Sequence, residues 1–393
     1  MLDSQVRIVH VITSTRVGGA EMMLYKVLSR LDHKRFQSIV VSLESPGTLS
    51  EWIERLGYPV YSLHVRSGRL RVRNTIKEIR RFQPDIIQGW MVHGNIAAQL
   101  MTVLLPRDVP VLWNVRHSLP FPNNPMTAAL VRLMAYTSSR ARWILYNSHA
   151  SALKHEALGY DPRRTLVIPN GFDCSAFRPD AEARASIRNE LGLSDGVPLI
   201  GLVARVHPDK DHGNFLRAAE QLVSPGEPAH FLMVGRGTKA YLAAQSAALK
   251  LTGRYHALDE GRDMPAIMNA LDIATCSSQT EAFPNVIGEA MACGVPAVVT
   301  DVGDSARLVG GIGRVVPARN SAALAEAWRE LLDLGQVACR ELGEASRRRI
   351  LSEFSLERVV PCYEHLYWDV AHGGNSNAAE QHAEFRQPVN LKR

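Results

Sequence analysis

The chain has 393 residues, of which 46% are hydrophobic and 21% charged, and this length is enough for two domains with separate cores. Such proportions are typical of a soluble globular protein and exclude wholesale disorder. The five cysteines are never spaced as a metal-binding pair, and the N-terminus lacks a basic lead with a cleavage site. The sequence therefore predicts a reduced, cytoplasmic protein without disulfides, a zinc site or a signal peptide.

Charge is distributed unevenly along the chain. Residues 1–178 hold 23 Lys and Arg against 12 Asp and Glu, whereas the remainder holds 22 against 27. The excess peaks in one basic stretch, which comprises Arg66, Arg69, Arg71, Arg73, Lys77, Arg80 and Arg81. This pattern fits either a solvated helix face or a surface that meets an anionic membrane leaflet or a phosphorylated acceptor. Nucleic acid is not indicated, because no aromatic residues interleave the charges.

The first predicted element is a buried parallel strand at Val6–Ile12, followed by a turn and a helix that begins near Glu21. Gly18 and Gly19 lie in this turn, where they would let the backbone approach a ligand closely. A dinucleotide fingerprint requires three glycines and an acid at the end of the next strand, so these two glycines do not complete one.

Further strand-like runs alternate with helical patterns, which predicts a doubly wound parallel sheet. These runs are Ser38–Leu43, Val60–Leu63, Ile86–Gln88, Val111–Asn114 and Trp143–Asn147. The uncharged stretch 86–106 is interpreted as a strand, a loop and a buried helix rather than as a membrane span. Ligands bind such sheets at the carboxyl ends of the strands, and this rule selects His93, Arg116 and His117. A structural role for either histidine stays open.

The domain boundary is predicted from turn chemistry. Residues 170–173 are Asn-Gly-Phe-Asp, and the chain is then charged and interrupted by Pro and Gly up to residue 194. We therefore expect a first domain at 1–178 and a second at 179–355, followed by a helix at 356–371 that, as in related folds, crosses back to the first domain. The tail at 372–393 lacks apolar periodicity and is predicted to be disordered.

The second domain is predicted to begin with a strand at Leu199–Val203. Arg205 and Lys210 follow this strand and are placed to neutralise a diphosphate, Arg as a fork of donors and Lys as a point charge. Asp209 and Asp211 formally match a metal-binding pair, but Lys210 between them favours phosphate, so no metal is predicted. The G-x-G-x-x-A pattern at 235–240 is interpreted as a tight strand-to-helix turn.

Residues 271–300 predict a buried strand, a polar turn and a short helix. Pro284 suits the first helical position, and Gly294 with Pro296 would end the helix before a strand at Ala297–Thr300. The N–H groups at the helix start, on Asn285, Val286 and Ile287, are predicted to be free for an anion. Glu281 and Glu289 would flank this terminus.

The spacing of these two glutamates, with Ala-Met-Ala-Cys-Gly-Val-Pro at 290–296, resembles the signature of glycosyltransferase family 4. Gly-Gly-Ala-Glu at 18–21 and Pro-Asn-Gly-x-Asp at 169–173 resemble further family segments, and residues 89–95 resemble a motif of members that assemble bacterial polysaccharides. Asp-Val-Gly-Asp at 301–304 departs from the family's usual Gly-Gly. The resemblance covers the chain to about residue 371.

This resemblance implies a GT-B fold, with two doubly wound parallel-sheet domains facing across a cleft. It implies a retaining enzyme without metal or other cofactor that moves a sugar from a UDP- or GDP-sugar to a hydroxyl acceptor in cell-surface or exopolysaccharide assembly. Such an acceptor would be lipid-linked or a glycan, and the enzyme would be cytoplasmic or peripheral on the inner membrane face. The alternative is a nucleotide-sugar epimerase of the same fold; a non-catalytic nucleotide or sugar sensor and a dehydrogenase are further alternatives.

The resemblance also implies roles for individual residues. Arg205, Lys210 and the helix start at Asn285, Val286 and Ile287 would hold the donor diphosphate, close to Gly18 and Gly19. Glu289 would bind the ribose, Glu281 would position the transferred sugar, and His117 would contact that sugar. His93 and Arg116 would lie on the acceptor side.

Overall fold

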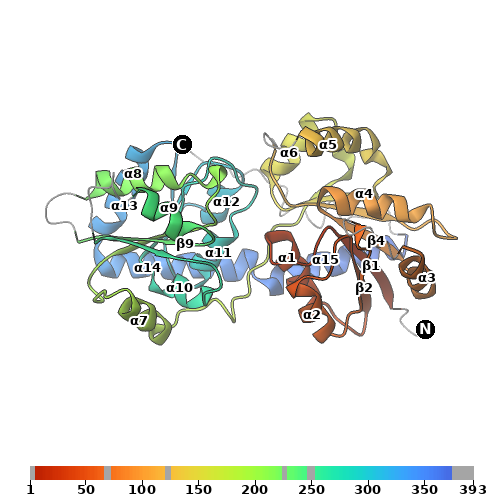
Figure 1. Ribbon diagram of the computed structural model, residues 1–393, viewed down its shortest axis with the longest axis horizontal. Helices are drawn as coiled ribbons and strands as arrows, with labels where there is room; N and C mark the ends of the chain where they lie inside the picture. The colour runs from red at the N-terminus through yellow and green to blue at the C-terminus, as the bar shows by residue number, and fades with distance from the viewer. Residues whose placement is uncertain (1–4, 66–71, 120–124, 224–227, 246–252, 374–393) are drawn as a thin grey trace. The chain divides into compact units, whose positions relative to one another are not determined.

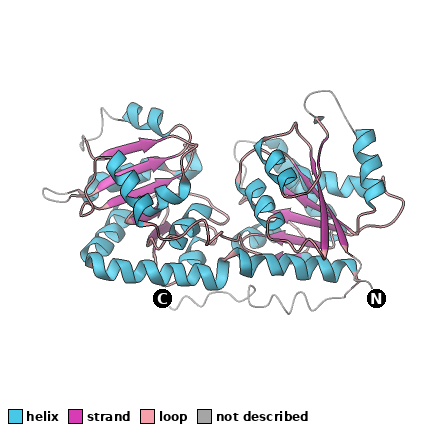
Figure 2. Ribbon diagram, turned by 90° about the horizontal axis from the view of Figure 1, so that it is seen from below, coloured by secondary structure: helices cyan, strands magenta, loops and turns pink. Residues whose placement is uncertain are grey.

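The computed structural model describes residues 5–65, 72–119, 125–223, 228–245 and 253–373. The chain divides into two compact units, unit 1 (Met1–Gly171 and Leu356–Arg393) and unit 2 (Phe172–Ser355) (Figure 1). In each unit a layer of strands is flanked by helices (Figure 2).

The chain passes from unit 1 to unit 2 between Gly171 and Phe172, ahead of the expected boundary at residue 178. Phe172 belongs to unit 2 because its N–H donates a 2.8 Å hydrogen bond to the Phe354 carbonyl and its fully buried ring packs against Gly288. The turn residues at 170–173 indicated a domain boundary near this point, but only the packing of Phe172 fixes the residue at which unit 2 begins.

Unit 1 contains one parallel seven-stranded sheet in the order β3-β2-β1-β4-β5-β6-β7. Its strands are β1 (Val6–Ile12), β2 (Phe36–Ser42), β3 (Val60–Ser62), β4 (Ile86–Trp90), β5 (Val111–Val115), β6 (Trp143–Tyr146) and β7 (Thr165–Val167). The strand order reverses beside β1, so the predicted doubly wound sheet is confirmed.

Helices cover both faces of this sheet. Apolar side chains of α1, α2 and α15 pack on one face, and those of α3, α4, α5 and α6 pack on the other. Their bounds are α1 (Gly19–Leu28), α2 (Thr48–Arg55), α3 (Val72–Phe82), α4 (Met91–Thr102), α5 (Pro125–Thr137), α6 (His149–Ala157) and α15 (Leu356–Ala371). Val359, Tyr363 and Tyr367 are the buried contacts of α15 with this sheet.

The loop expected after residue 88 is absent from this described part of the chain. Strand β4 runs to Trp90 and α4 starts at the next residue, Met91, which has a positive φ of 65°. Two glycines permit this tight crossing. A Cβ atom on Gly89 would lie 2.4 Å from the Cα of Asn95, and one on Gly94 would lie 2.5 Å from the Val11 carbonyl oxygen. Both glycines therefore serve close packing rather than chain breaks.

Unit 2 contains a parallel six-stranded sheet in the order β10-β9-β8-β11-β12-β13. Its strands are β8 (Leu199–Val203), β9 (His230–Val234), β10 (Tyr255–Leu258), β11 (Ile273–Cys276), β12 (Ala297–Thr300) and β13 (Arg314–Val316). The edge strand β13 was not predicted, because its two valines, which follow a cation, are too few to form an apolar run.

The helices of unit 2 also lie on both faces. Apolar residues of α7, α10, α11 and α12 pack on one face, and those of α8 and α13 pack on the other, with α9 and α14 contributing partly buried residues there. Their bounds are α7 (Ala181–Glu190), α8 (His212–Leu222), α9 (Thr238–Gln245), α10 (Met264–Ala270), α11 (Asn285–Ala292), α12 (Ser305–Val309), α13 (Ser321–Asp333) and α14 (Gly335–Arg349).

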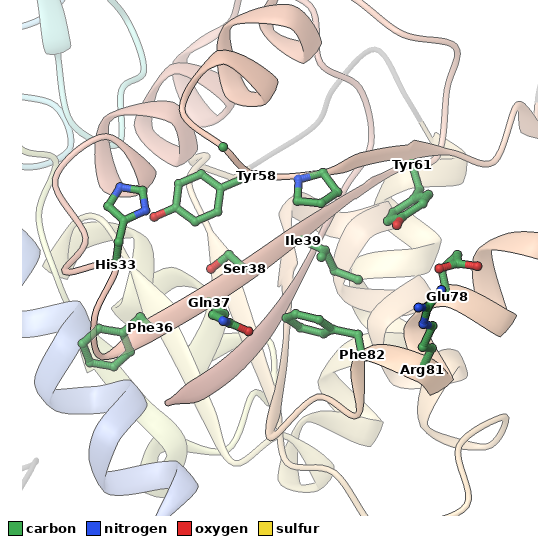
Figure 3. Close-up of a pocket in the computed structure, with 12 residues that line it drawn as sticks. His33, Phe36, Gln37, Ser38, Ile39, Tyr58, Tyr61, Glu78, Arg81 and Phe82 are labelled. Carbon is green, nitrogen blue, oxygen red and sulfur yellow. The ribbon is translucent and has the colours of Figure 1, made fainter. Parts of the chain in front are cut away.

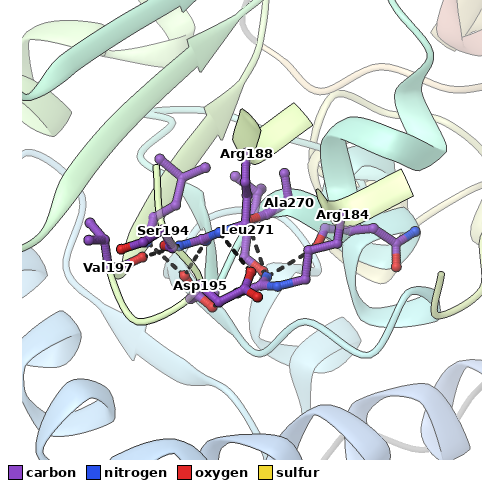
Figure 4. Close-up of polar contacts among 10 residues, drawn as sticks. Arg184, Arg188, Ser194, Asp195, Val197, Ala270 and Leu271 are labelled. Carbon is purple, nitrogen blue, oxygen red and sulfur yellow. Dashed lines mark hydrogen bonds and ion pairs between the residues drawn. The ribbon is translucent and has the colours of Figure 1, made fainter. Parts of the chain in front are cut away.

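A buried arginine anchors α7 to the amino ends of two strands (Figure 4). Arg188 donates to the carbonyls of Ser194 (2.6 Å), Val197 and Ala270 (3.2 Å), and to the Asp272 carboxylate (3.1 Å). Asp272 also accepts from the Leu199 N–H at 2.7 Å. This cluster satisfies the buried charge and lies at the end of the sheet away from the carboxyl edge.

The predicted basic stretch is only partly described. Arg66, Arg69 and Arg71 lie outside the described residues, as does the predicted disordered tail from residue 374 onward. Arg73, Lys77, Arg80 and Arg81 lie on α3 and are exposed. Across the described ranges, no helix combines the length and apolar character that crossing a membrane requires.

Candidate active site

The candidate site of unit 2 is built from loops at the carboxyl edge of its sheet. Strands β8 and β11 are neighbours in the sheet, so the loops that follow them lie side by side. Lys210 closes a short 3₁₀ turn at Pro208–Lys210 after β8, and Glu281 lies in the loop between β11 and α11. Adjacent parallel strands therefore bring these two distant sequence positions together.

Lys210 and Glu281 form a direct ion pair, in which the Lys210 Nζ donates to Oε1 of Glu281. The same carboxylate oxygen accepts a 2.7 Å hydrogen bond from the Ser278 hydroxyl and a 3.8 Å contact from the Cys276 thiol. The Glu281 side chain is only 12% exposed and that of Lys210 28% exposed, so the pair is partly desolvated and held in one geometry.

The electrostatics of the pair follow from this burial. Burial disfavours the charged ammonium most strongly, but neighbouring groups, chiefly the Glu281 carboxylate, together raise the pKa of Lys210 above its ordinary value. Burial, with the Glu281 charge acting in the same direction, raises the pKa of the Cys276 thiol to about 11. Lys210 is therefore a fixed cation and Cys276 a neutral thiol at physiological pH.

Arg205 lies at the same edge, exposed, and close enough that its charge opposes protonation of Lys210. The turn after β9 packs against this segment: a Cβ atom on Gly235 would lie 2.9 Å from the Arg205 nitrogen, and the Val206 N–H donates to the Arg236 carbonyl at 2.9 Å. Gly235 has a φ of 140°. The predicted strand-to-helix turn at 235–240 thus supports the backbone that carries Arg205.

Hydrogen bonds fasten the β8 and β11 loops to each other. The Gln279 N–H donates to the Asp209 carbonyl at 2.7 Å, and the Ser277 hydroxyl donates to the Lys210 carbonyl at 2.8 Å. The Gln279 side chain donates to Asp211 at 2.9 Å and accepts from Arg319 at 2.7 Å. The sequence prediction did not include Ser278, Gln279 or Arg319. Ser278 and Gln279 follow the end of β11 and could have been found by that position, but no local pattern indicates Arg319.

The two aspartates beside Lys210 have separate structural roles. Asp211 has a left-handed φ of 47° and caps α8 by accepting from the Asn214 N–H at 3.1 Å. The Asp209 carboxylate instead lies 3.2 Å from Nδ1 of His207. Their side chains are therefore not directed to one common point, and among the described residues no cluster of three or more acidic, His or Cys side chains could hold a metal ion.

The start of α11 differs in detail from the prediction. Pro284 is the N-cap residue rather than the first helical residue, and its carbonyl accepts from the Ile287 N–H at 3.1 Å. The Ile287 N–H is thus already bonded, so the prediction that it is free was wrong. Asn285 and Val286 form the first turn, and Glu289 lies one turn further, half-buried. Gly294, with a φ of 80°, follows the helix end as predicted.

The loop at 301–304 packs directly on the backbone of Glu281. A Cβ atom on Gly303 would lie 2.4 Å from the Glu281 carbonyl oxygen, and the Asp304 N–H donates to the Ala282 carbonyl at 3.0 Å. Gly303 also has a positive φ of 59°, so both the close contact and the backbone conformation favour glycine at this position. The segment that departs from the family pattern therefore positions Glu281.

In unit 1, the side chain of His117 is turned into the protein. Both of its ring nitrogens are buried, and its ring meets that of His155 edge to face at 5.3 Å. The Ser151 hydroxyl donates to the His117 carbonyl at 2.7 Å, and His155 Nδ1 lies 2.8 Å from the Ser151 carbonyl. Burial and the neighbouring His155 lower the pKa of His117 to about 3, so it is neutral.

Arg116 is engaged within unit 1. Its guanidinium donates to the Asn170 side chain and to the Tyr363 hydroxyl of α15, and it lies 5.3 Å from the centre of the Trp90 ring. These contacts join the carboxyl edge of the sheet to α15. The guanidinium of Arg116 therefore has a structural role within unit 1, whereas the sequence predicted a role on the acceptor side.

The remaining residues predicted in unit 1 lie at its carboxyl edge. Gly18 caps α1 and Gly19 is its first residue, while His93 is exposed on the first turn of α4. β1 and β4 are adjacent, so these positions belong to the same edge. Burial raises the pKa of Glu21, which accepts a 3.3 Å hydrogen bond from Ser14.

A separate hollow of about 500 Å³ lies in unit 1 beside the first half of β2 (Figure 3). β3 pairs only with Val40–Ser42, so among the described residues no strand pairs with this edge of β2 before Val40. Tyr58, Tyr61 and Phe82 line it, with Glu78 and Arg81 at one side. The hollow lies toward the amino end of β2 and contains none of the predicted site residues.

Comparisons with known proteins agree with this architecture. Residues 17–176 match the model of Glycosyltransferase Family 4, and residues 197–334 match that of Glycosyl transferases group 1. The D-inositol 3-phosphate glycosyltransferase of Geodermatophilus obscurus is 32% identical over 244 residues, which cover 58% of this chain and 50% of that protein. The chain spans about half or less of the first curated relatives that it matches.

Other relatives are matched over more of their length. The putative glycosyltransferase EpsF of Bacillus subtilis is 25% identical over 320 residues, covering 77% of this chain and 80% of that protein. Among solved structures, Anabaena Alr3699/HepE in complex with UDP-glucose has a TM-score of 0.78 at 21% identity, covering 94% of this chain and 99% of that chain. A glycosyltransferase from Rickettsia africae has a TM-score of 0.80 at 18% identity, covering 95% and 100%.

The two parallel sheets and these structural likenesses define the class: the fold is GT-B, the two-domain fold of many glycosyltransferases. One family match lies in unit 1 except for its last five residues, the other lies in unit 2, and together they extend the assignment. The chain belongs to the family 4 type of glycosyltransferases, which confirms the resemblance drawn from its motifs.

Proposed function

We propose that this chain transfers a sugar from a nucleotide diphosphate donor, a UDP- or GDP-sugar, to a hydroxyl acceptor with retention of the anomeric configuration. The observation that carries the proposal is the Lys210–Glu281 pair at the carboxyl edge of unit 2, with Arg205 beside it. Two cations next to a helix start suit a departing diphosphate, and stabilising such charge is usually the largest contribution to catalysis. HepE, whose fold this chain shares, has been crystallised with UDP-glucose.

Lys210 can serve the donor without leaving Glu281. An ammonium has three N–H donors, and the pair with Glu281 uses one of them. The others can bind phosphate oxygens while Arg205 adds a bidentate contact. Asn285, Val286 and the positive end of α11 would complete the phosphate site, and Glu289 would accept hydrogen bonds from the ribose.

We propose that Glu281 positions the sugar and does not attack it. Its Oε1 already accepts hydrogen bonds from an ammonium and a hydroxyl, which leaves fewer of its lone pairs for an attack on the sugar. Attack by the acceptor would then occur on the face of the leaving group, and the leaving phosphate would take the acceptor proton. His117 would orient the sugar, a role that requires its ring to turn away from His155.

The acceptor is proposed to bind unit 1 beside His93, while Gly18 and Gly19, on the same sheet edge, keep the donor-side role that the resemblance implies. Arg116 would take part only indirectly, by holding Asn170 and α15 in place. We propose a lipid-linked or glycan acceptor used in bacterial cell-surface or exopolysaccharide assembly, with the enzyme cytoplasmic and peripheral on the inner face of the membrane. The reaction is proposed to need no metal and no other cofactor.

A donor screen tests this function. The chain is mixed with UDP-, GDP- or dTDP-sugars, and the melting temperature and the release of free sugar are recorded. A donor present at about 100 times its dissociation constant should stabilise by about 2.7 kcal/mol, an increase of several degrees. Stabilisation by none of them would overturn the donor assignment, and an isomeric nucleotide sugar formed without acceptor would identify an epimerase instead. NMR of the product linkage decides retention.

A further inference from the structure

Helix α5 of unit 1 presents apolar side chains to solvent as well as to the core. Val131, Met134 and Ala135 are buried and pack against the sheet. Met126, Leu133 and Tyr136 are instead 75%, 60% and 89% exposed. They are large apolar residues for which the described part of the chain provides no covering element.

The exposed apolar residues of α5 form one continuous stripe. With the exposed Ala129, they occupy positions 126, 129, 133 and 136, and spacings of three and four residues place side chains on one side of a helix. The helix has 13 residues and is therefore about 20 Å long. We call Met126, Ala129, Leu133 and Tyr136 the α5 stripe.

Within the stretch of sequence that carries the α5 stripe all the charged residues are cations, although Asp108, just before this stretch, lines one hollow with Arg140. Residues 109–155 contain no Asp or Glu at all, whereas they contain Arg116, Arg132, Arg140, Arg142 and Lys154. Arg132 lies on α5 next to Leu133, and Arg140 lies just beyond its C-terminal end; both are exposed. This stretch therefore contains no acidic residue that could form ion pairs with the same cations on a second copy of the chain.

We propose that the α5 stripe lies in the interface of an anionic lipid bilayer, with Arg132 and Arg140 contacting lipid headgroups. An amphipathic helix with apolar side chains on one side and cations at its margins binds such interfaces, and Tyr is favoured at the headgroup level. Each exposed cation near an anionic leaflet adds attraction that salt screens. The proposal names the surface for the membrane association included in the proposed function and rests on that part of it.

Vesicle flotation tests this proposal with the full-length chain. Vesicles of phosphatidylcholine containing about one third phosphatidylglycerol are compared with vesicles of phosphatidylcholine alone. We expect the chain to float only with the anionic vesicles and to be released by high salt. The double variant Met126→Gln/Leu133→Gln should reduce the bound fraction about tenfold or more, and Arg132→Glu should reduce it further.

Val337→Gln is the matched control, because Val337 is 74% exposed on α14 of unit 2. It should float as the unsubstituted chain does. Equal binding by the double variant and the control, or no flotation of any form, would overturn the proposal. A dimer in sedimentation that becomes a monomer only in the double variant would overturn it in favour of a contact between copies. Flotation needs no donor, so failure here is distinguishable from failure of the donor screen.

Discussion

The Nζ atom of Lys210 is hydrogen-bonded to Oε1 of Glu281, a residue 71 positions further along the chain. Each residue follows a strand of the same parallel sheet, and those two strands are neighbours. The pair joins a cation suited to a leaving diphosphate with a carboxylate suited to sugar hydroxyls. Substitutions at this pair therefore test the proposed chemistry most directly.

Replacing Lys210 by alanine should lower turnover by about 10²- to 10³-fold, because one charge-stabilising donor at a developing anion is removed. Steady-state kinetics with the donor found in the screen measures this loss, and the melting temperature reports whether the fold persists. Arg329→Ala is the control, since Arg329 forms an exposed pair with Glu326 on α13. Turnover at the unsubstituted rate would remove Lys210 from the leaving-group site.

Replacing Glu289 by alanine should weaken nucleotide binding about tenfold, because a charged hydrogen-bond acceptor for the ribose is lost. Isothermal titration with UDP and GDP measures the change, and the catalytic rate at saturating donor should alter less. Glu341→Ala, an exposed position on α14, serves as the control. An unchanged nucleotide affinity would contradict the ribose assignment.

Gly288→Ala should reduce the free energy of unfolding by about 1–3 kcal/mol, the usual cost of overpacking. An added Cβ would lie 2.0 Å from the buried Phe172 ring, and this clash outweighs the better helix propensity of alanine. Denaturant unfolding measures the loss. Gly311→Ala, where the added atom meets open space, should be nearly neutral. Phe172→Leu combined with Gly288→Ala should recover part of the loss, which a cause other than the ring contact would not produce.

Arg116→Gln should destabilise unit 1 by about 1–3 kcal/mol, because partly buried hydrogen bonds to Asn170 and Tyr363 are lost. The Michaelis constant for the acceptor should stay near its original value. Thermal unfolding and acceptor kinetics separate the two effects, with the exposed Arg55→Gln as control. Unchanged stability with a raised Michaelis constant would instead support direct acceptor binding by Arg116.

Acid should destabilise unit 1 through its buried histidines. Burial lowers the pKa of His10 to about 3 and that of His155 to about 4, and burial together with His155 lowers the pKa of His117 to about 3. Because unfolding lets these rings take up protons below pH 6.5, the stability that they contribute is present above pH 6.5 and is lost as pH falls toward 3. Each ring should cost about 1.4 kcal/mol per pH unit in that window.

Denaturant unfolding at pH 7, 6 and 5 measures this slope. His10→Gln, which keeps a polar partner for Trp90 and Ser38, should make the slope shallower by one proton. The exposed His372→Gln should leave it unchanged. Equal slopes for all three forms would show that His10 is not protonated on unfolding in this range.

Local sequence patterns predicted much of the fold, as particular elements show. Val6–Ile12, Leu199–Val203 and Ala297–Thr300 are strands with the predicted bounds, because each is an apolar run bounded by polar or turn residues. The end of α11 just before Gly294 was predictable, because the left-handed conformation that follows a helix end favours glycine. The three-residue β13 offered no such pattern.

For the candidate site, the sequence predicted individual residues but not their bonding partners. Position after a strand end selected Lys210 and Arg205, and position before a helix start, with the resemblance, selected Glu281, but neither indicated which side chains bond to one another. For the same reason the sequence left Arg116 and His117 as candidate ligands, although the one bonds to α15 and the other turns toward His155. The N–H of Ile287 was expected to be free, but it donates a hydrogen bond to the Pro284 carbonyl.

The sequence by itself thus determined where strands and helices lie and which residues follow the strand ends, because hydrophobic period, capping and turn preference act over a few neighbouring residues. Only the tertiary structure decided that Lys210 pairs with Glu281 and Arg116 with Tyr363, which are 71 and 247 positions apart. Partner choice depends on which strands become neighbours and on how deeply each side chain is buried, and both are set by packing of the whole unit.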